Sequence, residues 1–306
     1  MKIRIGTRKS KLALWQAHHT KSLLETAWPQ VTCEIVHFVT EGDKSQASGK
    51  PLPQIGGKGL FTLELERSLH SAEIDIAVHS LKDLPVEQPE GLTLGAIPQR
   101  GTVEDALVAK HDYRLGTLPF GAIVGTSSLR RQAQLLAARP DLNVQSIRGN
   151  VPTRIRKMLD GQYHAIVLAR VGVERLEMAE HVRQILPTDI MLPAPGQGAL
   201  GIQCRANDVD TLGLLNAIDH PLTRACVSAE RAFLNGLGAG CSLPVGAFAR
   251  WDASHDRPIH LEGVVGSVDG NHMIEVSARG SDPFELGTTL AQTALQRGAA
   301  KLLSHG

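Results

Sequence analysis

The sequence predicts an α/β protein with a small α+β domain at its C-terminal end. Residues 2–97 and 121–169 alternate short apolar or β-branched runs with runs in which apolar residues recur at helical spacing. This alternation is typical of βα units. After residue 222, one helical run is followed by three strand-like runs and a last helical run. We therefore expect two α/β lobes followed by a third domain of different character.

The elements follow from these patterns in chain order. Strands are expected at residues 2–6, 31–40, 76–78, 92–97, 121–125, 144–147, 165–169, 199–205, 246–250, 259–265 and 272–278. Helices are expected at residues 12–23, 60–71, 129–138, from 151, at 222–235 and at 285–303. Residues 41–59 contain many Gly, Ser, Lys and Pro without apolar periodicity, which favours a long loop of the kind that often forms a lid.

Composition excludes several classes of protein. The chain has 306 residues, 42% hydrophobic and 21% charged, which is typical of a soluble globular protein with two or three domains. Its net charge of +1 gives no global indication of nucleic acid or an anionic membrane as partner. No N-terminal signal core and no apolar run of roughly 20 residues is evident, so we expect a cytoplasmic protein.

Cysteine and histidine spacing predicts neither a disulfide framework nor a metal site. Cys33, Cys204 and Cys226 lie in strand-like or helix-like runs and are expected to be small buried side chains. Cys241 lies in a loop with glycines on both sides, although the pattern alone still favours an inert thiol. The 13 histidines show no His-Glu-x-x-His or comparable spacing, so no metal is expected.

A carboxylate follows the predicted strand at residues 76–78. Lys82 and Asp83 come just after this strand, and Pro85 prevents a continuation because it has no N–H group. Polar residues beyond the carboxyl ends of strands in α/β sheets line the crevice in which ligands bind. Asp83 is therefore expected to point into a cleft. A solvated loop with an ordinary ion pair fits this segment equally well.

Cations and hydroxyls recur at the other strand ends. Thr126, Ser127 and Ser128 form a cluster suited to capping a helix, and Arg130 and Arg131 follow in its first turn. Cations at that position oppose the helix dipole, which costs stability unless an anion lies between them. We take this mismatch as the strongest indication of an anion site. A solvated helix face is the alternative.

Further cations extend the same pattern along the chain. Arg8 and Ser10 precede the first helix, and Lys58 lies in a glycine turn that does not match a nucleotide P-loop. The remaining arginines follow the strands expected at residues 144–147 and 165–169, and they are Arg148, Arg154, Arg156, Arg170 and Arg175. A single arginine is usually a surface residue, but arginines at one end of successive parallel strands favour an anion site.

These segments together resemble the porphobilinogen deaminase family. The matching motifs are Gly6-Thr7-Arg8-Lys9-Ser10, Leu14-Trp15-Gln16-Ala17, Gly56-Gly57-Lys58-Gly59-Leu60-Phe61, Ala77-Val78-His79-Ser80-Leu81-Lys82-Asp83-Leu84-Pro85, Gly125-Thr126-Ser127-Ser128-Leu129-Arg130-Arg131-Gln132, Arg148-Gly149-Asn150-Val151, Pro195-Gly196-Gln197-Gly198-Ala199-Leu200-Gly201 and Gly240-Cys241. Their number and order make coincidence implausible, while the last sixty residues match only in general character.

The resemblance implies three domains. The first two are similar to the lobes of periplasmic binding proteins, with mixed sheets. Residues 1–99 with 199–216 would form the first lobe, residues 104–192 the second, and residues 221–306 an α+β domain that carries the cofactor cysteine. The resemblance also implies a covalent dipyrromethane cofactor joined by a thioether to Cys241. It further implies that Asp83 is the catalytic carboxylate.

The resemblance also implies which side chains bind the acetate and propionate groups of the pyrroles. The cofactor-binding set is Cys241, Lys82, Asp83, Thr126, Ser127, Ser128, Arg130, Arg131, Arg148 and Gly149. The substrate-binding set is Arg8, Ser10, Lys58, Arg148, Arg154, Arg175 and Gln197. Four positions, Glu41, Glu104, Arg170 and Gln203, depart from the expected pattern.

The implied activity is that of a transferase in porphyrin and heme biosynthesis. It would join four porphobilinogen molecules head-to-tail into the linear tetrapyrrole hydroxymethylbilane, release ammonia, and act as a cytoplasmic monomer. The alternative is a two-lobed cytosolic receptor for carboxylates. Asp83 argues against a receptor, because an anion in the cleft would repel its ligand. A dipyrromethane on Cys241, measured as added mass, would separate the two hypotheses.

Overall fold

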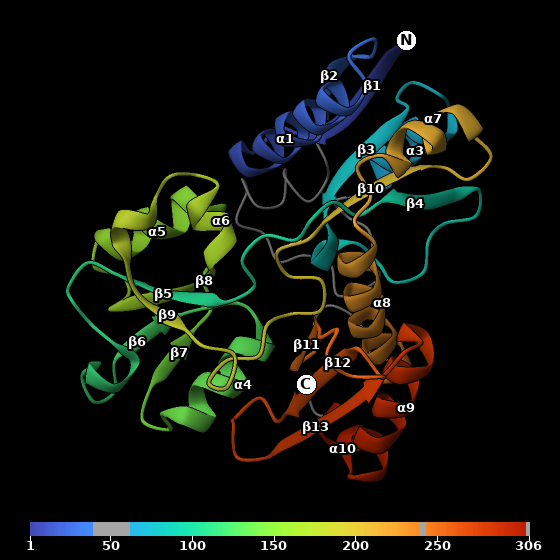
Figure 1. Cartoon of the computed structure of the whole chain (residues 1–306). Coiled ribbons are helices and arrows are strands. Elements are labelled where there is room, and N and C mark those ends of the chain that lie inside the picture. The colour runs from blue at the N-terminus through green and yellow to red at the C-terminus, as the bar shows by residue number, and fades with distance from the viewer. Residues whose placement is uncertain (39–61, 239–242, 304–306) are drawn as a thin grey trace. The chain divides into compact units, whose positions relative to one another are not determined.

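The structure of this chain is a computed structural model that describes residues 1–38, 62–238 and 243–303. It divides into two compact units. The first contains Met1–Gly101 and Gly198–Arg224, and the second contains Thr102–Gln197 and Ala225–Gly306. Figure 1 shows the elements of both units in the colours of the chain order.

The first unit is built on a mixed five-stranded sheet with the order β2-β1-β3-β10-β4. Its strands are β1 (Lys2–Arg8), β2 (Thr32–Phe38), β3 (Ile76–Ser80), β4 (Leu92–Ala96) and β10 (Leu200–Arg205). Strand β1 pairs in parallel with β2 and β3, whereas β10 runs antiparallel to β3 and β4. Because β10 completes this sheet, the chain returns to the first unit after leaving it.

Three described helices belong to the first unit, α1 (Lys11–Ala27), α3 (Leu63–His70) and α7 (Val209–Asn216). Helix α1 begins at the N-cap residue Ser10, whose side chain accepts a hydrogen bond from the Ala13 N–H at 3.3 Å. The core between α1 and the sheet contains Ile5, Leu24 and Ile202, all almost fully buried. Burial of this apolar layer holds the carboxyl ends of β1 and β3 in place.

The second unit contains a five-stranded sheet with the order β7-β6-β8-β5-β9. Its strands are β5 (Asp105–Ala109), β6 (Ile123–Gly125), β7 (Asn143–Gln145), β8 (Ala165–Ala169) and β9 (Val182–Leu186). Strand β6 is parallel to β7 and β8, and β5 is antiparallel to β8 and β9. The carboxyl ends of three parallel strands therefore lie at one edge, together with the first residue of β5.

Helices cover both faces of this sheet. They are α4 (Leu129–Ala138), α5 (Val151–Leu159) and the short α6 (Arg170–Glu174). Leu135 of α4 packs in one apolar cluster with Leu107 of β5, while Ile155 of α5 packs in another with Val108. Successive residues of β5 thus face two different cores, which explains why its sequence shows no apolar–polar alternation.

The second unit also contains the three-stranded antiparallel sheet β11-β12-β13. The strands are β11 (Val245–Trp251), β12 (Ile259–Gly266) and β13 (Met273–Gly280), and the helices that follow them are α9 (Pro283–Gln296) and α10 (Ala299–Leu303). Helix α8 (Pro221–Gly236) begins in the first unit and belongs to the second from Ala225 on. Helix α9 packs on β12 and β13. The prediction of one helix over residues 285–303 is wrong, because Gly298 has a φ of +99° and separates α9 from α10.

The predicted fold class is confirmed by these three sheets and their helices. The sequence reading missed β5, β9, α6 and α7, and the division into three domains remains a prediction beside the two compact units. Cys33, Cys204 and Cys226 are buried, as predicted. The predicted long loop at residues 41–59 lies outside the described residues.

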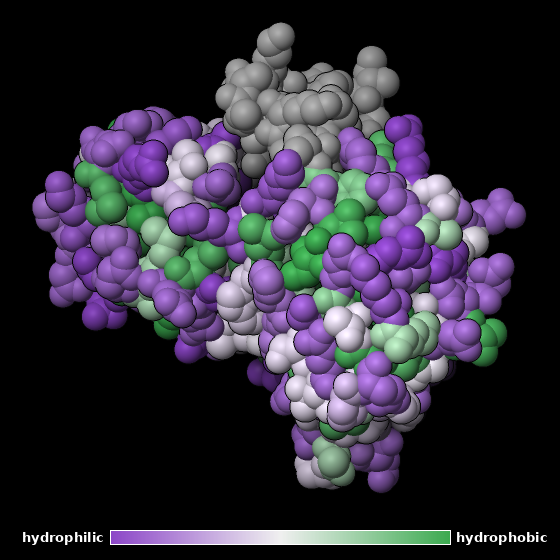
Figure 2. Space-filling view, turned by 90° about the horizontal axis from the view of Figure 1, so that it is seen from above, coloured by the Kyte–Doolittle hydropathy of each residue, from purple (hydrophilic) through white to green (hydrophobic). Residues whose placement is uncertain are grey.

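Exposed apolar side chains are dispersed over the described surface. Phe120 and Val209 are the most exposed of them and belong to different units. On the face seen in Figure 2, hydrophilic residues predominate and apolar residues lie among them in small groups. Within the described ranges, no helix combines the length and the apolar character needed to span a membrane.

Candidate functional site

Asp83 lies where the sequence predicted it, just past the carboxyl end of β3. It is the last residue of a single 3₁₀ turn, Leu81–Asp83, whose first residue donates its N–H to the Ala199 carbonyl at 3.0 Å. Leu81 and Leu84 are fully buried on either side, so their packing fixes the turn that carries Lys82 and Asp83. The Asp83 side chain is exposed. Its exposure gives no support to the expected position inside a cleft.

Two more predicted residues of the first unit lie near that sheet edge. Arg8 is the last residue of β1, and its positive charge helps to lower the pKa of the buried His79 in β3. The Ser10 hydroxyl caps α1, which gives it a structural role in this unit. Gln16 of α1 donates from Nε2 to the Ser80 hydroxyl at 2.7 Å and ties the helix to the end of β3.

In the second unit, the three predicted hydroxyl residues build the turn between β6 and α4. Thr126 accepts the Ser128 N–H at 3.2 Å through its hydroxyl, and Ser128 is the N-cap of α4. The Ser127 hydroxyl donates to the Ile147 carbonyl at 2.7 Å and accepts the Ile147 N–H at 3.1 Å. These bonds fix the turn against the segment after β7, where Arg148 follows.

Arg130 and Arg131 are held by a carboxylate of the chain itself. Asp105, fully buried at the start of β5, accepts from Nη2 of Arg130 at 2.8 Å and from Nη2 of Arg131 at 2.7 Å. Asp105 therefore supplies one anion between the two cations, and the ligand site expected from the helix-dipole mismatch stays a prediction. Burial lowers the pKa of Arg130, and the adjacent Asp105 opposes this change.

The sequence alone did not assign Asp105 a role. Gln197 joins the same cluster. It is fully buried and donates from Nε2 to the Val103 carbonyl at 2.7 Å and to Asp105 Oδ1 at 3.0 Å. The signal that could have identified Asp105 is its place directly before four apolar residues, because a carboxylate buried at the start of such a strand requires paired donors.

Arg148 differs from the two arginines of α4. It is exposed, and its guanidinium makes no hydrogen bond or ion pair with any residue in the described ranges. The next residue, Gly149, has a φ of +117°, and a Cβ there would lie 2.8 Å from Thr153 Cγ2. Arg154 donates from Nε to the Gly149 carbonyl at 2.7 Å. This glycine turn thus places Arg148 and Arg154 together at the N-terminus of α5.

Two residues that depart from the expected family pattern, Arg170 and Glu104, form an ion pair with each other. Arg170 Nη1 lies 3.7 Å from Glu104 Oε1, and Arg170 Nε lies 2.6 Å from Glu174 Oε1. Arg170 is thus neutralised within the unit. Arg175 closes α6 and is half-buried, and burial lowers its pKa to about 10.

Two predicted residues cannot be placed, because Lys58 and Cys241 lie outside the described residues. Glu41, which also departs from the expected family pattern, lies outside the described residues too. Across residues 1–38, 62–238 and 243–303, no group of three or more His, Cys, Asp or Glu side chains could hold a metal ion. The common groove predicted for Asp83 and the arginines stays a prediction, since the two sets belong to different units.

Two buried donors fit an anionic cofactor. Nε of Arg130 and Nε of Arg131 have no hydrogen-bond partner among the described residues. A buried donor without an acceptor costs about 1–3 kcal/mol. A group bearing carboxylates, such as a dipyrromethane, would supply the missing acceptors. The residues present at the N-terminus of α4 therefore fit such a group.

The two mixed five-stranded sheets, with polar and cationic residues after their strands, place the chain in the class of α/β proteins. Residues 3–213 match the family model described as "Porphobilinogen deaminase, dipyromethane cofactor binding domain", and residues 224–296 match "Porphobilinogen deaminase, C-terminal domain". The chain belongs to the porphobilinogen deaminase family. The family resemblance drawn from the motifs is thereby confirmed.

Curated relatives share this family over their whole length. The porphobilinogen deaminase of Brevibacillus brevis is 47% identical over 304 residues, which cover 99% of this chain and 97% of that protein. The enzyme of Moorella thermoacetica is 47% identical over 307 residues, covering 100% of this chain and 96% of that protein. That of Roseiflexus castenholzii is 45% identical over 301 residues, covering 98% of each.

Solved structures of low identity also match part of this chain. The periplasmic VFT2 domain of BvgS from Bordetella pertussis has a TM-score of 0.43 and 14% identity, covering 71% of this chain and 86% of that chain. The methionine binding protein MetQ has a TM-score of 0.45 and 14% identity, covering 71% and 89%. These values are too low to carry a functional argument, and the receptor alternative is not favoured.

Proposed function

We propose that the chain is a hydroxymethylbilane synthase, a transferase that joins four porphobilinogen molecules head-to-tail and releases ammonia. The observation that carries this proposal is the match of both family domains, in order, across residues 3–213 and 224–296. The position of Asp83 at the end of β3 is consistent with it. A dipyrromethane bound through Cys241 would supply the fixed end on which the product chain is built.

Arg148, Arg154 and Arg175 are the side chains we assign to the substrate carboxylates. Porphobilinogen carries two carboxylates, so a growing oligopyrrole is a polyanion. Arginine suits these groups because its planar guanidinium binds a carboxylate through two parallel hydrogen bonds. The exposed Arg148 is available for this task, since no described residue pairs with it. Lys82, half-buried beside Asp83, would act in the first unit.

Asp83 is the residue we assign to the chemical step. When the carbon–nitrogen bond of porphobilinogen breaks, ammonia leaves with the bonding electrons and the methylene carbon becomes electron-poor. A carboxylate near the pyrrole N–H stabilises this positive charge. The new carbon–carbon bond forms when an electron-rich pyrrole α-carbon attacks the methylene, and that α-carbon then loses a proton. Asp83 can hold a proton between these events. Water finally releases the linear tetrapyrrole.

Intact-mass measurement tests the proposal directly. The native chain should exceed its sequence mass by one dipyrromethane, and the Cys241→Ser variant should not. Cys226→Ala is the matched control, because Cys226 is a buried cysteine elsewhere in the second unit and its loss should leave the added mass in place. A native chain at its sequence mass that also fails to convert porphobilinogen would refute the proposed function.

A cytoplasmic monomer that uses neither nucleic acid nor a membrane is part of the same proposal. The net charge of +1 and the dispersal of exposed apolar side chains support it. In sedimentation velocity we expect one species at the chain mass of 32.9 kDa. A stable dimer at micromolar concentration would contradict the monomer.

A further inference from the structure

We propose that Asp105 is a positioning residue of the ligand site, one that locks Arg130 and Arg131 into a single cationic unit. This inference rests on the proposed function, and it assigns a role to a side chain that the motifs left without one. The unit would take one carboxylate of the bound pyrrole, not two.

The contacts hold each guanidinium at two points. Arg130 donates from Nη2 to Asp105 Oδ2 at 2.8 Å and from Nη1 to the Leu192 carbonyl at 2.7 Å. Arg131 donates from Nη2 to Asp105 Oδ1 at 2.7 Å and from Nη1 to the Val167 carbonyl at 3.0 Å. Neither planar group can rotate without breaking a buried hydrogen bond. The side chains are therefore rigid before any ligand binds.

The cluster carries one net positive charge. Arginine stays protonated in proteins, so two guanidiniums and one carboxylate leave +1. Gln197 contributes a neutral donor to Asp105. The charged groups that act on the pKa of Arg130 are Asp105 and Arg131, which indicates that the three form an electrostatic unit of their own. An uncompensated buried charge is costly, and one carboxylate is the anion that cancels it.

The unsatisfied donors point to the same ligand group. Nε of Arg130 and Nε of Arg131 are buried and have no partner in the described part of the chain. Both belong to the first turn of α4, whose own N–H groups and dipole also favour an anion. Since Asp105 fixes both guanidiniums, a change at Asp105 should disturb both donors at once. This coupling distinguishes a positioning residue from a carboxylate that only stabilises the fold.

Asp105→Asn is the direct test. The amide keeps the shape, raises the cluster charge from +1 to +2, and can accept from only one of the two arginines. We expect a folded protein in which the fraction of chains carrying the dipyrromethane mass falls at least about tenfold, with a raised KM for porphobilinogen in the chains that retain it. Asp141→Asn is the matched control. Asp141 also accepts hydrogen bonds from an arginine through both carboxylate oxygens, and this arginine, Arg139, lies at the other end of α4.

A second variant decides the matter if Asp105→Asn does not fold. Asp105→Glu keeps the charge and displaces the carboxylate by one methylene, so a positioning role again predicts a reduced loaded fraction or a raised KM. Complete loading with a normal KM in either folded variant would overturn the inference. An unmodified, inactive wild-type chain would refute the proposed function instead, before any variant is compared.

Discussion

Nη2 of Arg131 lies 2.7 Å from Oδ1 of Asp105, and both side chains are more than nine-tenths buried. Arg148, in the same unit, is exposed and pairs with no described residue. The sequence treated these arginines as equivalent contacts for anions. The structure separates them into one that is bound inside the unit and one that is available, and they should respond differently to substitution.

Arg131→Leu is expected to cost stability as well as activity. Removing one partner of a buried pair leaves Asp105 with a single cation, and such losses amount to about 3–5 kcal/mol. The urea midpoint of the variant should fall clearly below that of the wild type. An unchanged midpoint with impaired turnover would show that Arg131 acts on the ligand alone.

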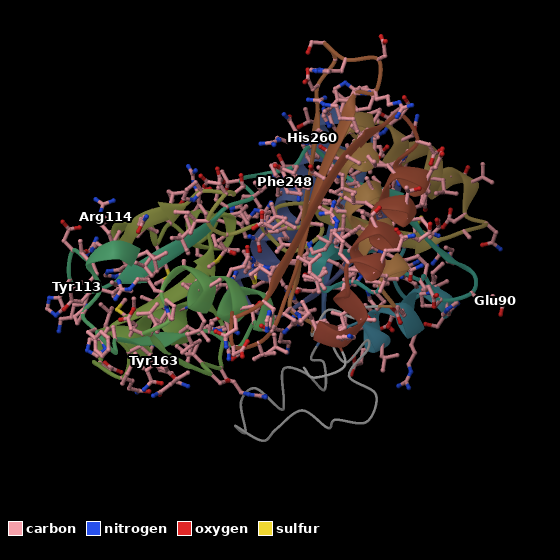
Figure 3. All side chains as sticks on the ribbon, turned by 90° about the horizontal axis from the view of Figure 1, so that it is seen from below. Glu90, Tyr113, Arg114, Tyr163, Phe248 and His260 are labelled. Atoms are coloured by element: carbon pink, nitrogen blue, oxygen red, sulfur yellow. The ribbon has the colours of Figure 1, made fainter. Side chains whose placement is uncertain are left out.

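Arg148→Leu is expected to leave folding intact. An exposed side chain without a partner contributes within about 0.5 kcal/mol to stability. We expect a lower kcat/KM for porphobilinogen at an unchanged urea midpoint. Arg114→Leu is the control, because Arg114 is also exposed and lies beside Tyr113 at the outer edge of the second unit (Figure 3). Equal kinetics in the two variants would remove Arg148 from the substrate site.

Asp83→Asn should abolish most turnover in a stable protein. The side chain is exposed, while the buried Leu81 and Leu84 hold its turn, so the amide should fit without strain. Loss of the negative charge removes the stabilisation of the electron-poor carbon. Glu90→Gln is the control, since Glu90 is an exposed acid of the same unit, labelled in Figure 3. Wild-type rates in Asp83→Asn would take the catalytic role away from Asp83.

His79 predicts a pH dependence of stability. Burial lowers its pKa to about 4, against about 6.5 in an unfolded chain. The unfolded chain therefore binds more protons between these values, and stability should fall as the pH drops from about 6.5 to about 4, by about 3 kcal/mol in all. Above pH 7 the group has no effect.

Urea unfolding at pH 7 and pH 4.5 measures this effect. The two pH values lie on either side of the pKa of an unfolded histidine, which is about 6.5. His79→Gln should lose less stability between the two pH values than the wild type. The control is His18→Gln, because His18 is exposed on α1 in the same unit. Identical losses in the wild type and His79→Gln would show that His79 is not the source.

Much of the fold followed from local pattern. Strand β8 and helix α4 have the predicted bounds, because a bounded apolar run and a capped amphipathic run each carry an unambiguous period. Strand β5 was missed, since it packs against two cores and shows no alternation. The break at Gly298 was missed because a glycine in a helical run often continues the helix.

The sequence by itself determined the family, the order of the βα units, the position of Asp83 after β3 and the gathering of arginines at strand ends. These depend on residues close together along the chain. Only the tertiary structure decided that Asp105 pairs with both Arg130 and Arg131 while Arg148 stays available. The partners are 25 and 26 residues apart. Local spacing carries no information about such a contact, because the pairing of β5 with β8 brings it about.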